Sequence, residues 1–81
     1  MSDYIKQLKT MLLAKLAGFK ILEKSPSVFA IVKDNKIHAL VKDQGEYVIV
    51  TIAGKDYKYD KWYTKPEHLT NVLVNYLSQQ Q

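Results

Sequence analysis

The chain contains no cysteine and no arginine, and only three glycines occur among its 81 residues. Without cysteine, a disulfide scaffold, a thiolate zinc site, an iron–sulfur cluster and a cysteine nucleophile are all excluded. The glycines stand alone at positions 18, 45 and 54, each at an expected cap or turn, so they do not make a phosphate-binding loop. The sequence therefore indicates no cofactor.

Long hydrophobic runs are also missing. The longest unbroken apolar run extends from Val28 to Val32, whereas a spanning helix needs about 20 apolar residues. Lys15 interrupts the apolar stretch that begins at Met11, where the core of a signal peptide would lie. We therefore expect a cytoplasmic protein that does not associate with membranes.

Positive charge exceeds negative charge, and all of it comes from lysine. Twelve lysines against eight acidic residues give a net charge of +4 and a pI near 9.3, which permits acidic partners without demanding them. Arginine supplies the planar fork that reads guanine edges, so its absence weighs against sequence-specific binding in the major groove. Lysine is better suited to weak, non-specific contacts.

The remaining composition is that of a small globular protein. Hydrophobic residues make up 47% of the chain and charged residues 25%, and a chain of this length has room for one core. Internal repeats and linker-like segments are not apparent in the sequence. We predict a single domain over residues 1–78, followed by a frayed tail over residues 79–81.

Residues 3–17 are predicted to form an amphipathic helix. Its apolar residues recur at three- and four-residue steps, namely Ile5, Leu8, Leu12 and Leu16. Ser2 is the expected N-cap, and Gly18 falls where a left-handed C-terminal residue is required. Phe19 follows as the hydrophobic contact that often accompanies such an ending.

A second helix is predicted over residues 65–79. Thr64 and Glu67 have the spacing of a capping box, and Pro66 falls in the first turn, where a missing N–H is harmless. The apolar stripe of this helix consists of Leu69, Val72, Leu73, Tyr76 and Leu77.

Between the helices, β-branched and aromatic residues are interrupted by turn signals at regular intervals. These signals are Ser25-Pro26-Ser27, Asp34-Asn35, Gln44-Gly45 and Gly54-Lys55. They predict strands over residues 19–24, 28–33, 36–42, 46–53 and 56–62. The fold class is therefore α+β, with a five-stranded antiparallel meander flanked in sequence by two helices that both pack on one sheet face.

Two-residue turns would fix the register of the three middle hairpins. Pairing Val32 with Ile37, Val41 with Val48, and Ile52 with Tyr57 collects an apolar face under the helices. That face is predicted to contain Val28, Ala30, Val32, Ile37, Ala39, Val41, Val48, Val50, Ile52, Tyr57 and Tyr59.

The second face of the predicted sheet has an apolar centre that neither helix covers. We predict partner binding by Phe29, Ile31, Leu40, Tyr47, Ile49 and Trp62, with a rim formed by Lys33, Lys36, His38, Lys42 and Lys58. A solvated sheet face would normally be polar, and a contiguous apolar patch usually marks an interface. This pattern favours a small non-enzymatic interaction module that forms a homodimer or binds another protein. The alternative is that one helix crosses to cover this face.

A second function remains open, namely non-specific binding of nucleic acid. In residues 55–65 lysines alternate with four aromatic residues, which could stack on bases while the lysines hold phosphates. The rim lysines and His38 would serve this role as well. Against it, the predicted register directs Tyr57 and Tyr59 into the core, and two aspartates offset part of the charge.

Catalysis is a third possibility, with little support in the sequence. His38 could act as a base near Thr51 and Asp60, but the sequence offers no accompanying nucleophile and orienting group. Neither histidine has a partner at metal-ligand spacing. We therefore predict that the protein is not an enzyme and holds no metal.

Overall fold

The computed structural model describes residues 3–79, which form one sheet and two helices. In chain order the elements are α1 (Asp3–Lys15), β1 (Lys20–Ser25), β2 (Val28–Lys33), β3 (Lys36–Gln44), β4 (Tyr47–Ile52), β5 (Lys55–Asp60) and α2 (Pro66–Ser78). Each strand pairs antiparallel with the next, so the sheet order is β1-β2-β3-β4-β5. The predicted α+β meander is confirmed.

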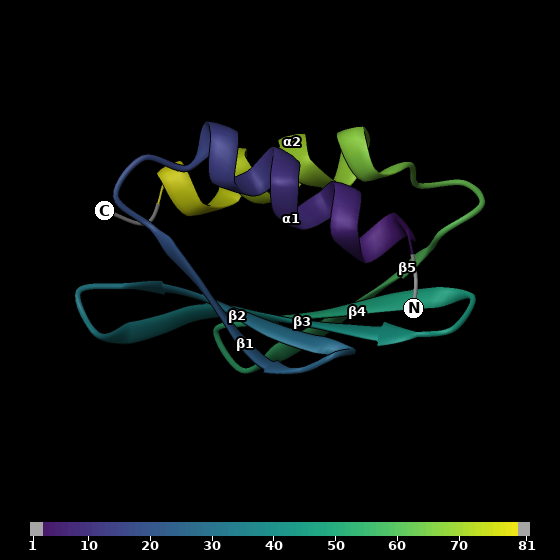
Figure 1. The fold of residues 1–81 in the computed structure, drawn as a ribbon, viewed down its shortest axis with the longest axis horizontal. Helices are drawn as coiled ribbons and strands as arrows, with labels where there is room; N and C mark the ends of the chain where they lie inside the picture. The colour runs from purple at the N-terminus through teal and green to yellow at the C-terminus, as the bar shows by residue number, and fades with distance from the viewer. Residues whose placement is uncertain (1–2, 80–81) are drawn as a thin grey trace.

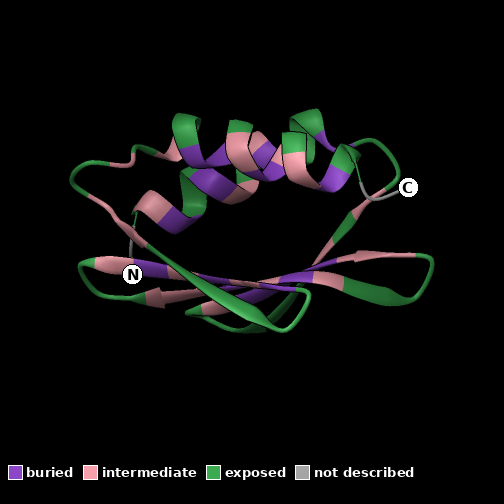
Figure 2. Ribbon diagram, turned by 180° about the vertical axis from the view of Figure 1, so that it is seen from behind, coloured by how far each residue is buried: buried purple, intermediate pink, exposed green. Residues whose placement is uncertain are grey.

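Both helices lie side by side on the same face of the sheet (Figure 1). The core fills the space between the two layers, and its largest fully buried side chains include Phe29, Leu8, Leu12, Leu69 and Leu73. The opposite face of the sheet has no helix on it in either view (Figure 2). Among the described residues, no helix is long and apolar enough to cross a membrane.

The helices bury the stripes that their periodicity predicts. Ile5, Leu8 and Leu12 of α1 are buried, and Leu16 beyond its end is buried as well. Leu69, Leu73 and Leu77 are the buried leucines of α2. Gly18 follows α1 with a φ of 82°, the left-handed conformation expected of a helix C-terminus.

The predicted side-chain caps of the two helices are not found in the described residues. The predicted N-cap of α1, Ser2, lies outside the described residues. At α2 the prediction of a capping box is wrong, because the N-cap is Lys65 and no side chain caps the helix. Thr64 instead uses its backbone: its N–H donates to the carbonyl of Asp60, and its carbonyl accepts from the Tyr4 hydroxyl at 2.6 Å. Pro66 does occupy the first turn, as predicted.

Two of the hairpin turns contain consecutive residues with positive φ. Asp34 and Asn35 have φ of 54° and 64°, and Ala53 and Gly54 have φ of 54° and 79°. Such pairs form the type I′ turns that match the twist of antiparallel strands. The turn at Ala53-Gly54 replaces the predicted one at Gly54-Lys55, so Val50 rather than Ile52 pairs with Tyr57. The β3–β4 turn is displaced as well, so Val41 pairs with Val50 rather than with the predicted Val48. The face assigned to each residue of β4 and β5 is unchanged, because the shift is by two residues.

The β2–β3 hairpin differs from prediction in a more important way. Val32 pairs with Ile37 as predicted, but the next pair joins Ile31 to Ala39. His38 is therefore the extra residue of a β-bulge. The bulge reverses β2 relative to the part of β3 that begins at Ala39. Each side chain of β2 therefore points to the opposite face from the predicted one.

Phe29 and Ile31 were predicted on the uncovered face, and this placement is wrong. They are 1% and 0% exposed and belong to the core under the helices. We call the face away from the helices the open face. By alternation from the observed pairs, it carries Lys20, Leu22, Val28, Ala30, Val32, Ile37, Leu40, Lys42, Gln44, Tyr47, Ile49, Thr51, Asp56, Lys58 and Asp60.

Candidate interaction surface

The centre of the open face is apolar although no helix covers it. One row across the strands runs from Leu22 through Ala30 and Leu40 to Thr51. Leu22 is 52% exposed, and Leu40 is half-buried by its neighbours on the sheet. A solvated antiparallel face would normally carry polar side chains at such positions. Leu22 and Leu40 of this row therefore retain apolar surface that contact with another molecule could remove from water, whereas Ala30 between them is fully buried.

Leu40, Tyr47 and Ile49 lie on the open face, where the sequence predicted them. A second row places Ile49 between Lys42 and Lys58, so two lysine stems flank an isoleucine. Long lysine stems can cover apolar surface while their charged ends remain in water. This arrangement gives the apolar centre a charged border without burying any charge.

Three of the predicted rim residues lie on the helix side of the sheet instead. Lys33 pairs with Lys36 at the tip of the β2–β3 hairpin, and the Lys33 Nζ lies 5.1 Å from the centre of the Phe19 ring. The ring of His38 packs edge-on against Phe19 at 5.6 Å. The prediction that Lys33, Lys36 and His38 border the apolar centre is therefore wrong, because the bulge was not anticipated.

Local contacts hold the β4–β5 side of the open face. The Lys58 Nζ lies 4.0 Å from the centre of the Tyr47 ring, a cation–π contact between adjacent strands. The hydroxyl of Thr51 donates to Asp56 at 2.6 Å. On the open face β5 therefore carries Lys58 between Asp56 and Asp60, whereas β1 carries Lys20.

Trp62 is not on the sheet face but in the loop between β5 and α2. It is 73% exposed, and its neighbour Tyr63 is 83% exposed. The Asp60 carboxylate accepts from the backbone N–H groups of both, at 2.7 and 3.4 Å, and so fixes this part of the loop. The Lys65 Nζ lies 5.2 Å from the centre of the Trp62 ring. This pair of rings forms a second surface, distinct from the apolar rows of the sheet.

The same loop is anchored to α1 through half-buried polar contacts. Burial raises the pKa of Tyr4 to about 12, and its hydroxyl donates to the Thr64 carbonyl. Lys61 forms an ion pair with Asp43 at 2.5 Å, with both side chains largely buried. Its Nζ also lies 5.7 Å from the centre of the Tyr4 ring. These contacts fix the position of Trp62 relative to the sheet.

Four residues of the open face were not predicted to lie there. Val28, Ala30, Val32 and Ile37 were assigned to the helix side, and Ile37 is in fact 54% exposed. Strict alternation along an unbroken hairpin gave the wrong face for all four. A bulge has no strong signal of its own in a single sequence, so none of the patterns used could have placed them correctly.

The candidate catalytic residues of the sequence, His38 and Thr51, are not brought together in the described part of the chain. The hydroxyl of Thr51 is bonded to Asp56, while His38 lies on the other side of the sheet against Phe19. His68 is exposed on α2. Within residues 3–79, no three histidine, aspartate or glutamate side chains gather where they could hold a metal ion.

Comparison of the chain with family models, with curated proteins and with solved structures finds no match.

Proposed function

We propose that the protein is a small interaction module that pairs with a second copy of itself through the open face. The observation that carries this proposal is the apolar centre of Leu22, Leu40 and Ile49, left uncovered although both helices pack on the other face. Two sheets packed face to face lie about 10 Å apart and bury the side chains between them. A second copy would supply the missing layer.

The central position of Leu40 on the open face supports a second copy as the occupant. A two-fold axis parallel to the strands places β1 of one copy over β5 of the other and sets β3 over β3. Leu40 then meets Leu40 of the partner near the axis, and Thr51 lies over Ala30 of the partner. The middle of the open face is thus complementary to itself in hydrophobicity.

The area of the open face sets the affinity expected of the dimer. Five strands about 4.8 Å apart, with about six residues each, give a face of roughly 24 Å by 20 Å. Two such faces bury roughly 1,000 Å² in total, which is near the lower limit for specific interfaces. We therefore expect a dimer that dissociates on dilution.

The test is to replace Ile49 with glutamate and to measure the sedimentation of the protein. A charge at the centre of the face should abolish dimerisation, while the fold survives because Ile49 lies outside the core. The matched control is Leu13→Glu, which makes the same change at a residue of α1 that is 60% exposed and should leave the dimer intact. If Ile49→Glu remains dimeric, or if it unfolds the monomer, the proposed interface is wrong.

A second candidate function is favoured by the exposed rings of Trp62 and Tyr63. Neighbouring exposed aromatic rings beside a lysine can stack on the bases of a single strand without reading their sequence. The chain has one tryptophan, so quenching of its fluorescence by a mixed-sequence oligonucleotide reports on this loop directly. Binding should weaken with salt, with a log–log slope of about −0.7 for each phosphate neutralised. Quenching that is absent, or independent of salt, would remove nucleic acid from consideration.

A further inference from the structure

The outer edge of β1 is open to strand addition. β1 pairs with β2 on one side, and it is the first strand of the sheet, so in the described part of the chain no strand lies beyond it. An edge strand presents unpaired N–H and C=O groups, which can pair with an extended segment of another chain. Five of the six residues of β1 are exposed, so a partner can approach this edge.

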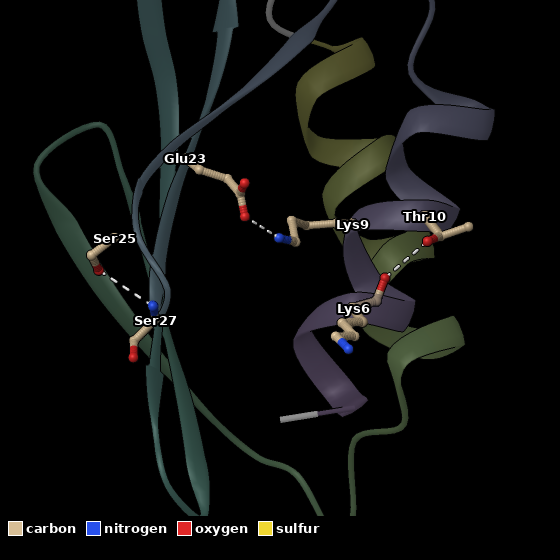
Figure 3. Close-up of polar contacts among 6 residues, drawn as sticks. All are labelled: Lys6, Lys9, Thr10, Glu23, Ser25 and Ser27. Carbon is tan, nitrogen blue, oxygen red and sulfur yellow. Dashed lines mark hydrogen bonds and ion pairs between the residues drawn. The ribbon is translucent and has the colours of Figure 1, made fainter. Parts of the chain in front are cut away.

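A groove lies beside this edge, between β1 and α1. Its volume is about 420 Å³, and its lining residues are Lys6, Lys9, Thr10, Leu13, Ile21 and Glu23. Figure 3 shows the two sides of the groove, joined by the hydrogen bond between Lys9 and Glu23 at 2.5 Å. The volume is within the range of ligand-binding clefts.

The groove offers an apolar contact that the fold itself does not use. Leu13 is 60% exposed on α1, outside the buried stripe of that helix. Across the groove, Ile21 of β1 packs partly against the core and completes an apolar wall. Thr10 does not offer its hydroxyl hydrogen to a ligand, since it donates to the Lys6 carbonyl at 3.0 Å. Leucine and isoleucine here are suited to a branched aliphatic side chain.

The geometry of an added strand matches this groove. Glu23 of β1 points toward α1, as its contact with Lys9 shows (Figure 3). Ile21, two residues earlier on the strand, lies on the same side and lines the same groove. A strand paired outside β1 would direct every second side chain the same way. Those side chains are about 6.6 Å apart, so one or two of them would enter the groove while the backbone pairs with the edge.

The charge around the edge selects an acidic occupant. Lys6 and Lys9 line the groove, and Lys20 and Lys24 lie on β1 itself, against a single carboxylate, Glu23, which already contacts Lys9. Pairing of β1 with β1 of a second copy is unfavourable. The full-length antiparallel register would oppose Ile21 to Lys24, and a shift of one residue would oppose Lys20 to Lys24.

We propose that the β1 edge and its groove bind an extended acidic segment of a different protein by strand addition. Aliphatic side chains of the segment occupy the groove beside Leu13, and its carboxylates lie near Lys20 and Lys24. The backbone of β1 supplies the hydrogen bonds. The groove at Leu13 lies on the helix side of the sheet, away from Ile49 on the open face, so the two proposals can be tested independently.

The probe is a short capped peptide of alternating valine and glutamate, titrated into isotopically labelled protein and followed by amide chemical shifts. Shifts confined to β1 and the facing turns of α1 are expected. A peptide of alternating valine and lysine is the charge control and should bind at least about tenfold more weakly. Equal binding of the two peptides, or shifts centred on β3 and β4, would overturn the proposal, as would a complete lack of shifts at millimolar peptide.

Backbone pairing is tested with two peptides N-methylated on alternate residues. The pattern that methylates the N–H groups facing β1 should weaken binding about tenfold or more, because those donors are lost. The complementary pattern should bind like the parent peptide. Equal affinities for both patterns would show that the peptide binds by charge alone, and would contradict strand addition.

Variants separate this site from the open face. Leu13→Glu should abolish binding of the acidic peptide yet retain the dimer, whereas Ile49→Glu should lose the dimer yet retain the peptide. Lys24→Glu should weaken peptide binding about two- to fivefold, and Lys55→Glu, the same change on the far edge of the sheet, should not. Unchanged peptide binding by Leu13→Glu would overturn the proposal, whatever the state of the dimer.

Discussion

The two faces of the sheet are built from the same strands but differ in what covers them. On the helix side, Phe29 and Ile31 are almost completely buried, whereas Leu22 and Ile37 on the open face are about half exposed. Both faces are rich in aliphatic residues, so composition alone does not distinguish them. The difference between the faces of β2 is set by one residue, His38, whose bulge decides which side chains of that strand meet the helices.

The largest change in the free energy of unfolding is expected from single-residue deletions, which test whether the bulge at His38 sets the faces of β2. Deleting His38 removes the extra residue but leaves every pair of the β2–β3 ladder in register. The deletion should therefore lower the free energy of unfolding by only about 1 kcal/mol. Deleting Ile49 from β4, which has no bulge, forces Val48 or Val50 out of the core and should prevent folding.

Urea denaturation followed by circular dichroism measures both deletions. If loss of His38 unfolds the chain as completely as loss of Ile49, the bulge is not a neutral insertion and the explanation of the two faces is wrong.

The next effect compares neighbouring residues on opposite faces. Phe29→Ala should lower the free energy of unfolding by about 3–5 kcal/mol, because it leaves a cavity under the helices. Val28→Ala, one residue earlier on the open face, should lower it by less than about 1 kcal/mol in the monomer. Thermal and urea unfolding at low protein concentration measure both values. Similar losses for the two variants would mean that both faces are core.

Alkaline pH should reveal the contact that anchors the β5–α2 loop. The pKa of Tyr4 is raised from 10.0 to about 12 by burial, so between these values the unfolded chain loses its proton before the folded chain does. The free energy of unfolding should therefore fall as pH rises from 10 to 12.

Tyr4→Phe is the control, since it keeps the ring and removes the ionisable hydroxyl. The variant should show a smaller decrease over this pH range, with Tyr59, whose pKa is also raised by burial, still contributing. An identical pH dependence in the two proteins would contradict the assignment to Tyr4.

The smallest effect concerns the β4–β5 turn. Ala53 has a φ of 54°, a conformation that costs an alanine roughly 1 kcal/mol. Ala53→Asn creates the Asn-Gly pair that type I′ turns prefer and should raise the free energy of unfolding by about 0.5–1 kcal/mol. The same replacement at Ala14, exposed on α1, should lower it. Destabilisation at Ala53 would show that the strain has been misjudged.

The architecture was predictable because its signals are local. The helix stripes at Ile5, Leu8 and Leu12 and at Leu69 and Leu73 depend on short periodicities, and the type I′ turn at Asp34-Asn35 on residues that tolerate positive φ. The β3–β4 and β4–β5 turns each lie one residue from the predicted position, which shifts the strand pairing by two residues and leaves the assigned faces unchanged. Local pattern was therefore enough to place both helices and the order of the strands.

The candidate surface was only partly predictable. Leu40, Tyr47 and Ile49 were placed on the correct face, whereas Phe29 and Ile31 were not, because an unrecognised bulge at His38 reverses every side chain of β2. Trp62 was expected on the sheet but follows β5 in a loop, where the backbone bonds to Asp60 end the strand. The groove beside Leu13 depends on how α1 sits over the β1 edge, which no periodicity within either element could reveal.

The most direct test of the central claim is the mass of the wild-type protein in solution, measured by light scattering over a wide range of concentration. Pairing through the open face predicts a mass that rises from 9.4 kDa toward twice that value as concentration increases. A mass that stays at 9.4 kDa up to the highest concentration reached would contradict the proposed dimer.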